Sequence, residues 1–281
     1  CRVAACFVTP HLADIADVAP AALDASLKAQ AAEHVGFGRW LQRNVHAHQN
    51  AQLRAVTLSF KRPGQSPGDA TSEQLIALAD LVDKYSAGEA RVTHDQNVLL
   101  PWVHASRLFD LWQEAKALGL ASANVQLLTD MIACPGGDFC ALANARSLPI
   151  AEAITQRYQD LDELDDIGEI DLHISGCINS CGHHHSGHIG ILGVDKDGKE
   201  WYQVTLGGSD GSDLSGTAVA GKVIGPSFSA SEVPDVIEAV LTTYRSLRDS
   251  GETFQATVRR TGLDPFKEAA KLARHPAKEA L

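Results

Sequence analysis

Four of the six cysteines stand in two short pairs set among glycines. In "CPGGDFC" five residues separate Cys134 from Cys140, and in "CINSC" three residues separate Cys177 from Cys181. Four thiols in this order can hold zinc, hold an iron–sulfur cluster or form disulfides. Structural zinc prefers two to four residues between paired cysteines, so the first loop is wide for it. Disulfides do not require flanking glycines, and a catalytic thiol requires one activated cysteine rather than four.

An iron–sulfur cluster is the chemistry that this pattern favours. A [4Fe-4S] cluster takes four cysteine thiolates, and backbone N–H groups turned toward the sulfurs stabilise its negative charge. Gly136, Gly137 and Gly182 let the backbone approach closely and present such groups. We expect Cys177 and Cys181 to face one side of a first helical turn, where the helix dipole favours an anion. A zinc site, or neither kind of site, remains the alternative at this point.

Composition and charge limit the classes of protein to consider. The chain has 281 residues, of which 44% are hydrophobic and 21% are charged, and its net charge is −11. This composition is typical of a globular protein with one large domain or two small ones. The acidity disfavours nucleic acid or an anionic membrane as the main partner. No apolar run reaches the length of a membrane span and no signal pattern opens the sequence, so we expect a cytoplasmic protein.

The first residue is unusual for a complete chain. The sequence starts at Cys1, and its only methionine is Met131. We therefore expect a fragment or a processed half of a longer protein, in preference to a lipoprotein acylated at Cys1. Cys1 and Cys6 lie outside any motif and are expected to be ordinary packing residues.

The region 31–122 predicts alternating strands and helices. The segment Leu53–Phe60 is rich in β-branched residues and alternates in polarity, which indicates a strand. The segment 71–88 begins with Thr71 and Gln74 at the spacing of a capping box, which indicates a helix. The expected buried stripe of this helix is Leu75, Leu78, Ala79 and Val82.

The region 123–281 predicts a second unit around the cysteines. We expect 136–159 to be helical with a break at Pro149, and 170–176 to be a short buried strand that leads into the second cysteine pair. The stretch that follows predicts a β-hairpin whose turn is Asp197-Gly198. An amphipathic helix is expected over 229–251.

The cysteine pairs and their surroundings resemble the siroheme-dependent nitrite and sulfite reductases. In that family, pairs with this spacing hold a [4Fe-4S] cluster, and the last cysteine also ligates the siroheme iron. The stretches "GEARVTHDQNVLL", "DLHISGCINSCGHHHSGHIGILG", "YQVTLGG", "VIGPSF" and "GLDPFKEA" also resemble the family. The resemblance implies that Cys134, Cys140, Cys177 and Cys181 are the cluster ligands and that Cys181 is the bridge to siroheme.

The same resemblance implies a fold class and further site residues. The fold would be α+β, with a ferredoxin-like half-domain over 31–122 followed by an α/β [4Fe-4S]/siroheme domain over 123–281. Residues 1–30 would be a helical lead-in from a missing N-terminal half. Asn179 would approach the active face. The candidate siroheme contacts are Thr93, His94, Gln96, Asn97, Gly207 and Gly208.

The histidines and glycines of this set have plainer interpretations as well. His183, His184 and His185 are consecutive, so they cannot all face one ion in a helix; capping, hydrogen bonding to cluster sulfurs or packing are favoured over metal ligation. His94 can be an ordinary turn residue. Gly207 and Gly208 can be the end of the hairpin.

The resemblance implies the C-terminal half of an enzyme that reduces sulfite to sulfide, or nitrite to ammonia, with six electrons from a ferredoxin or a flavoprotein reductase. Siroheme and both substrates are anions, yet the chain has 24 basic and 35 acidic residues, and Arg146 is the basic residue nearest to the cysteine pairs. The binding cations are implied to lie on the missing half, so we expect the isolated chain to be inactive. The alternatives are a cobalamin-pathway relative with the same modules, a cluster-bearing electron-transfer subunit without siroheme, and a zinc module.

Overall fold

The structure is a computed structural model that describes residues 18–211 and 217–274. The described residues form two compact units, of which the first contains 18–60 and 70–125 and the second contains 61–69 and the remainder. The expectations for Cys1, Cys6 and the start of the lead-in lie outside the described residues. Within the described ranges, no helix combines the length and the apolar composition needed to cross a membrane.

The first unit is built on a four-stranded antiparallel sheet with the order β1-β2-β4-β3. The predicted strand is β2 (Leu53–Leu58), which pairs with β1 (Val45–Ala47) on one side and with β4 (Val98–His104) on the other. The edge strand β3 (Arg91–Val92) pairs with β4. The helical elements are α1 (Pro20–Glu33), α2 (Val35–Asn44), α3 (Ser72–Tyr85), the 3-10 turn η2 (Ala105–Arg107) and α4 (Leu108–Ala117).

Helix α3 begins at the predicted capping box. The Thr71 hydroxyl accepts a hydrogen bond from the Gln74 backbone N–H at 3.1 Å, and the Gln74 side chain accepts one from Thr71 N–H at 3.0 Å. The Gln74 amide also donates to Leu118 O, which draws this polar side chain into the interior. The predicted stripe is wrong at Leu75 and Ala79, which are exposed. The buried stripe is Gln74, Leu78, Leu81, Val82 and Tyr85.

The second unit contains a five-stranded mixed sheet with the order β5-β6-β7-β8-β9. The strand predicted before the second cysteine pair is β6 (Leu172–Ser175), which runs parallel to β5 (Ile132–Ala133) and to β7 (Ile189–Lys196). The predicted hairpin joins β7 to β8 (Lys199–Leu206), and both turn residues have the positive φ that a two-residue hairpin turn requires, 56° at Asp197 and 74° at Gly198. The last strand, β9 (Lys222–Val223), pairs with β8.

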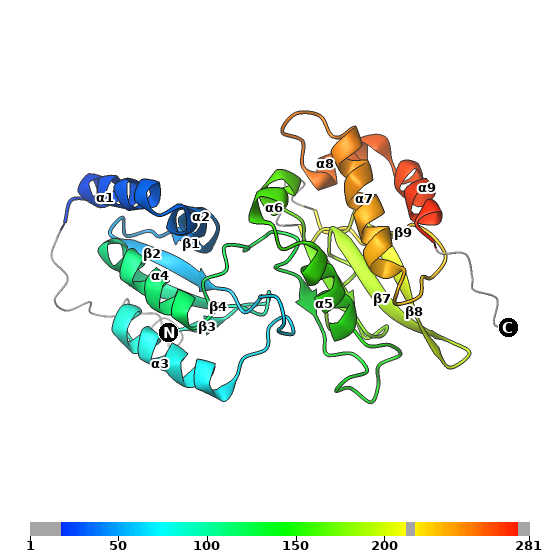
Figure 1. The fold of residues 1–281 in the computed structure, drawn as a ribbon, viewed down its shortest axis with the longest axis horizontal. Helices are drawn as coiled ribbons and strands as arrows, with labels where there is room; N and C mark the ends of the chain where they lie inside the picture. The colour runs from blue at the N-terminus through cyan, green and yellow to red at the C-terminus, as the bar shows by residue number, and fades with distance from the viewer. Residues whose placement is uncertain (1–17, 212–216, 275–281) are drawn as a thin grey trace, which may run out of the picture. The chain divides into compact units, whose positions relative to one another are not determined.

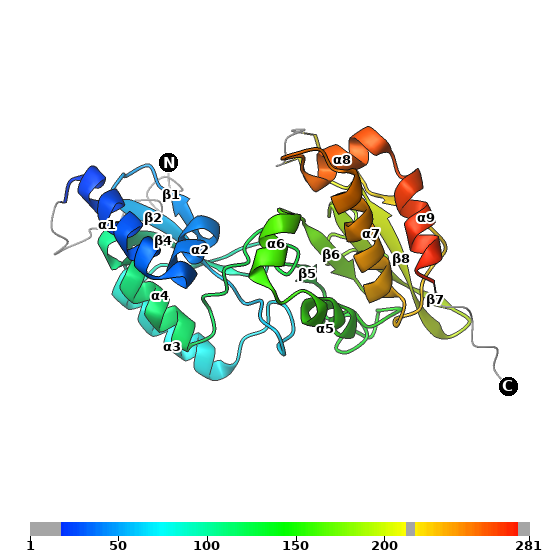
Figure 2. The ribbon, with the colours of Figure 1, turned by 45° about the horizontal axis from the view of Figure 1, so that its top comes forward.

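Helices α5, α7 and α9 cover one face of this sheet (Figures 1 and 2). Their apolar side chains pack against the strand residues Ile174, Ile191 and Val204, none of which is accessible to solvent. This burial holds the strands in register. The helices of the unit are α5 (Leu148–Arg157), α6 (Leu161–Ile167), α7 (Val233–Leu247), α8 (Phe254–Thr261) and α9 (Asp264–Leu272).

The expectation of a helix over 136–159 is wrong in its first half. Residues 136–147 form a loop without a helix, and α5 begins only at Leu148. Pro149 lies in the first turn of α5, where its missing N–H costs nothing. The proline therefore begins this helix and does not break it.

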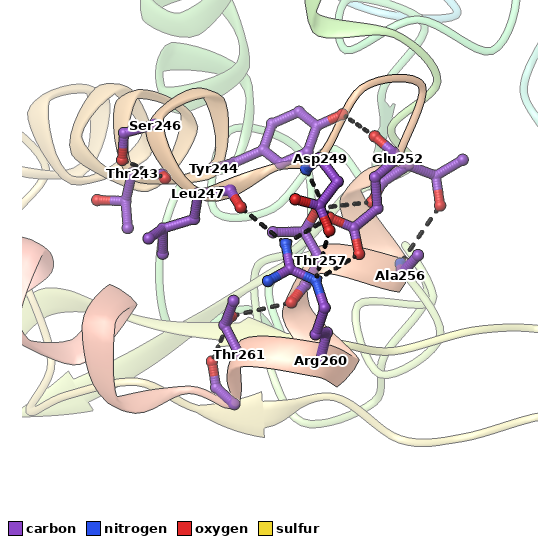
Figure 3. A network of polar contacts seen from close by, with 12 residues as sticks. Thr243, Tyr244, Ser246, Leu247, Asp249, Glu252, Ala256, Thr257, Arg260 and Thr261 are labelled. Atoms are coloured by element: carbon purple, nitrogen blue, oxygen red, sulfur yellow. Dashed lines mark hydrogen bonds and ion pairs between the residues drawn. The ribbon is translucent and has the colours of Figure 1, made fainter.

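A network of polar contacts centred on Glu252 holds the corner between α7 and α8 (Figure 3). The Glu252 carboxylate accepts two hydrogen bonds from the Arg260 guanidinium, at 2.8 and 2.6 Å, and further bonds from Asp249 N–H and the Thr257 hydroxyl. Tyr244 OH donates to the Glu252 carbonyl. Arg260 above all, and then the Asp249 amide, lower the pKa of Glu252 from 4.5 to about 2.

This network predicts a pH-dependent contribution to stability. Because the folded-state pKa of Glu252 lies below its unfolded value of 4.5, the stabilisation is fully present above that pH and is lost as the pH falls toward about 2. Glu252→Gln should therefore lower the melting temperature most at neutral pH. Thermal unfolding of both proteins across this pH range measures the difference, which should shrink with acidification. Glu268→Gln, on the exposed surface of α9, is the control. A difference independent of pH would contradict this role of the carboxylate.

Candidate metal centre

The two cysteine pairs begin at the carboxyl ends of neighbouring parallel strands. Strands β5 and β6 pair Ile132 with His173 and Ala133 with Ile174, and Cys134 is the next residue after β5. The Cys134 N–H donates to Ile174 O at 3.1 Å, which extends the ladder by one bond. Cys177 follows β6 after a single glycine. Parallel pairing therefore starts both cysteine loops side by side, at the edge of the sheet where open α/β sheets bind their ligands.

The first loop, 134–147, folds back against the second. Cys140 N–H donates to Gly136 O at 2.9 Å, which closes a tight turn between the two cysteines of the pair. Further along, Asn144 N–H and Ala145 N–H both donate to Gly176 O, at 2.9 and 3.0 Å. Because Gly176 immediately precedes Cys177, these bonds fasten the two loops together.

Glycines are required where the loops cross. A Cβ on Gly176 would lie 2.6 Å from Ala145 O and 2.7 Å from the Gly136 Cα, and one on Gly182 would lie 2.0 Å from Ile174 O. Gly136 also has φ of +60°. Side chains at these positions would push apart the backbone segments that carry the cysteines. Gly176 was not singled out from the sequence, although its place directly before a cysteine is the signal that could have identified it.

The second pair does not lie on a helix, so that expectation is wrong. The segment from Cys177 to Cys181 is a tight turn in which Ser180 N–H donates to Cys177 O at 3.2 Å and His183 N–H donates to Ser180 O at 2.8 Å. Ser180 and His183 both have left-handed backbones, with φ of 56° and 55°. A left-handed residue cannot continue a right-handed helix. Gly182 N–H donates to the Ser175 hydroxyl, which returns the chain to the end of β6.

The four thiols are unpaired and differ in exposure. Cys177 is buried, Cys134 and Cys140 are half-buried, and Cys181 is exposed. Gly176 N–H donates to the Cys134 sulfur at 3.1 Å, so the backbone already offers a donor to one sulfur. The Ser147 hydroxyl lies 3.6 Å from the same sulfur. Donors of this kind stabilise a thiolate and its metal complex.

The four cysteines belong to two loops that start side by side. Among the described residues, which include all four motif cysteines, no three His, Cys, Asp or Glu side chains meet closely enough to hold one metal ion. In a [4Fe-4S] cluster each thiolate ligates a different iron, so its cysteines surround a larger volume. Two glycine-lined loops that face one another, with a backbone donor to sulfur, suit that larger group.

The basic residue of the first cysteine loop is already paired. Arg146 forms an ion pair with Glu200 at 3.1 Å, and its carbonyl accepts a hydrogen bond from Tyr202 OH at 2.8 Å. The loops instead present apolar side chains to solvent. Phe139, Ile178 and Leu142 are 79%, 77% and 72% exposed.

The remaining candidates of the second unit lie near the same loops or on the neighbouring strand end. Asn179 is exposed between the last two cysteines. Gly207 N–H donates to His188 O at 3.0 Å. Gly208 is buried, its carbonyl accepts a hydrogen bond from the Gln255 side chain, and a Cβ there would lie 2.5 Å from His185 O. The structure thus explains Gly208 by close backbone packing within the chain.

The four candidates of the first unit share the turn between β3 and β4. Thr93 N–H donates to Asn97 O, and the Thr93 hydroxyl accepts from Asn97 N–H. Asn97 is buried, and its side chain accepts from Phe60 N–H at 3.1 Å. His94 is 81% exposed and pairs with Asp95. Gln96 takes the left-handed position of the turn, with φ of 57°.

Comparison with known proteins assigns this arrangement to a family. The model of the nitrite and sulphite reductase 4Fe-4S domain matches residues 125–276. The chain belongs to this family. A second model, the nitrite/sulfite reductase ferredoxin-like half domain, matches residues 46–118. The fold class predicted from the sequence is confirmed.

Relatives of the family are similar to most of this chain. An assimilatory ferredoxin-dependent nitrite reductase of Haloferax mediterranei is 30% identical over 206 residues, which are 72% of this chain and 34% of the relative. Sulfite reductase (ferredoxin) 1 of Mycolicibacterium paratuberculosis is 29% identical over 74% of this chain and 39% of the relative. The chain thus spans about a third to two fifths of the length of these curated relatives.

Two solved structures are also similar. The Mycobacterium tuberculosis NirA protein has a TM-score of 0.64 at 28% identity, over 80% of this chain and 41% of that one. The dissimilatory sulfite reductase I (DsrI) has a TM-score of 0.68 at 15% identity, over 85% and 75% of the two chains, which shows a shared fold.

The close approach of the second cysteine loop to β6 can be tested by adding one methyl group. Gly182→Ala should destabilise the second unit by about 2 kcal/mol, because its Cβ would meet the Ile174 carbonyl, a fixed part of β6. Gly137→Ala is the matched control in the first loop, since its Cβ would lie 3.2 Å from the flexible Arg146 side chain. Urea unfolding measures both. Equal stabilities of the two variants would show that the close approach at Gly182 is not required.

Proposed function

We propose that this chain holds a [4Fe-4S] cluster on Cys134, Cys140, Cys177 and Cys181. The observation that carries the proposal is the pairing of β5 with β6, which begins both cysteine loops at one edge of the sheet, together with the Gly176 N–H that donates to the Cys134 sulfur at 3.1 Å. The family's 4Fe-4S domain description supports the same assignment.

We propose further that the chain is the cluster-bearing part of a siroheme-dependent enzyme that reduces nitrite or sulfite. The cluster and siroheme, when bound, supply the electron transfer and the binding of the substrate anion at iron. The chain itself supplies ligands and donors. Cys181 is the most exposed of the four thiols, so its sulfur is accessible for a second metal beside the cluster. Asn179 is exposed in the same turn, and we propose that its side-chain amide donates to the substrate oxyanion.

The substrate and the donor of electrons follow from the relatives. These include ferredoxin-dependent nitrite reductases and a ferredoxin-dependent sulfite reductase, so we propose nitrite or sulfite as substrate and a ferredoxin as electron donor. Four unpaired thiols suit a reducing compartment, which supports a cytoplasmic location.

The electrostatics of the second unit support a site that is completed by other residues. Siroheme carboxylates and the substrate anion require several Arg or Lys donors. Near the cysteine loops, Arg146 is already paired with Glu200. We propose that the cations come from the part of the enzyme that the relatives have in addition to the matched region. Thr93, His94, Gln96, Asn97, Gly207 and Gly208 remain proposed siroheme contacts.

The proposal is tested by anaerobic reconstitution of the chain with iron and sulfide. A [4Fe-4S] cluster predicts about four iron atoms and about four acid-labile sulfides per chain. Cys140→Ser and Cys177→Ser should each reduce the cluster content strongly, because they remove one ligand from different loops. Colorimetric iron and sulfide assays on the desalted protein measure this content.

The control is Leu142→Ala, which changes an exposed residue of the first cysteine loop but removes no ligand, and which should keep the iron and sulfide content. Stoichiometric zinc without sulfide would contradict the proposal. Retention of full iron content by both cysteine variants would contradict the ligand assignment.

A further inference from the structure

Ser180 occupies an unfavourable backbone position between two cysteines. Its φ of 56° lies in the left-handed region, which glycine adopts readily and a residue with a side chain does not. The position is important, because the turn at Ser180 sets the direction in which the next residue, Cys181, leaves the loop. Beside the backbone bonds from Ser180 N–H to Cys177 O and from His183 N–H to Ser180 O, an interaction of the Ser180 side chain can stabilise this conformation against extended alternatives.

The interaction comes from His184. The Ser180 hydroxyl lies 3.1 Å from the His184 Nδ1, within hydrogen-bond distance. The imidazole is only 1% exposed, and its other nitrogen, Nε2, has no hydrogen-bond partner within the part of the chain that the structure describes. Burial first, and then the neighbouring His185 and His173, lower the pKa of His184 to about 4. The ring is therefore neutral at neutral pH, and Ser180 is its one hydrogen-bonding contact among the described residues.

His184 is itself held in place by the sheet. A Cβ on Gly190 would lie 2.0 Å from His184 O, so the His184 backbone rests directly on β7. The ring also contacts the ring of His185, with 3.9 Å between centroids. His183 and His185 on either side are exposed, so of the three consecutive histidines only His184 is directed inward. The His184 side chain is thus held in one place, and a hydrogen bond to it can stabilise the cysteine turn.

We propose that His184 is a positioning residue of the metal centre: through the Ser180 hydroxyl it holds the left-handed turn that presents Cys181. The proposal rests on the assignment of the four cysteines to a [4Fe-4S] cluster. It assigns to His184 a role that a glycine at position 180 would make unnecessary, because glycine adopts the left-handed backbone without a brace. If the two residues act together, the effects of substituting them should not be additive.

A double-mutant cycle on the reconstituted chain measures this coupling. His184→Leu should accelerate the loss of the cluster in air about fivefold, the factor that corresponds to one typical net hydrogen bond. Ser180→Ala should act in the same direction. In a Ser180→Gly background, His184→Leu should have little further effect. The rate is followed by the decay of the cluster's visible absorbance, and the midpoint potential of the cluster is measured on the same samples.

Two controls separate positioning from packing. His184→Asn keeps a polar atom close to the place of Nδ1 and should restore the slow rate and the original midpoint potential. His183→Leu changes an exposed neighbour and should alter neither. A thermal unfolding curve of each metal-free variant identifies any variant that fails to fold. If His184→Leu does not fold, the comparison of Ser180→Ala with the unchanged chain tests the proposal instead.

The outcomes distinguish this inference from the proposed function. If the unchanged chain takes up no cluster, the assignment of the cysteines fails. If it takes up the cluster and His184→Leu is equally harmful with serine or glycine at position 180, His184 acts only by packing and the inference is wrong. The inference is also wrong if His184→Leu and Ser180→Ala leave both the rate and the midpoint potential unchanged.

Discussion

The short parallel pairing of β5 with β6 is the constraint on which the metal centre depends. It consists of two residue pairs, Ile132 with His173 and Ala133 with Ile174. Without it, Cys134 and Cys177 are separated by more than forty positions of chain, and bringing them together would cost the entropy of closing that loop. The pairing is secured by burial, because Ile174 packs beneath α5 and α7 in a core that excludes water. The helices that cover the sheet therefore stabilise the geometry of the site.

The loops that continue from this pairing are built from backbone contacts. Gly176 accepts two amide bonds from the first loop and donates its own N–H to the Cys134 sulfur. A site assembled in this way provides partial positive charge for thiolates without any charged side chain. This explains how an acidic chain, with Arg146 already paired to Glu200, can hold an anionic cluster. Because Arg146 is already paired, we expect the chain on its own to bind a carboxylate-rich tetrapyrrole weakly.

The sequence predicted the structural features that neighbouring residues determine. It did not predict the features that depend on contacts between residues far apart in the chain. The capping box at Thr71 and the Asp197-Gly198 hairpin were predicted correctly, because neighbouring residues determine both. The turn after Cys177 was wrongly predicted to be helical. The local spacing of the cysteines does not reveal the left-handed backbone of Ser180 or the contact of its hydroxyl with the buried His184. Strand β5 has two residues, too few for any periodicity to reveal. The pairing that creates the site was therefore invisible in the sequence, although the cysteine spacing indicated the chemistry.

The central claim is that one cluster is shared by two loops, and its most direct test is Mössbauer spectroscopy of the chain reconstituted with isotopically enriched iron. A single [4Fe-4S] cluster ligated by Cys134, Cys140, Cys177 and Cys181 predicts one population of sulfur-coordinated iron with delocalised mixed valence. Iron bound separately by the two pairs would instead give ferric or ferrous mononuclear sites, or a smaller cluster. That result would contradict the claim that the β5–β6 pairing unites the four cysteines in one metal centre.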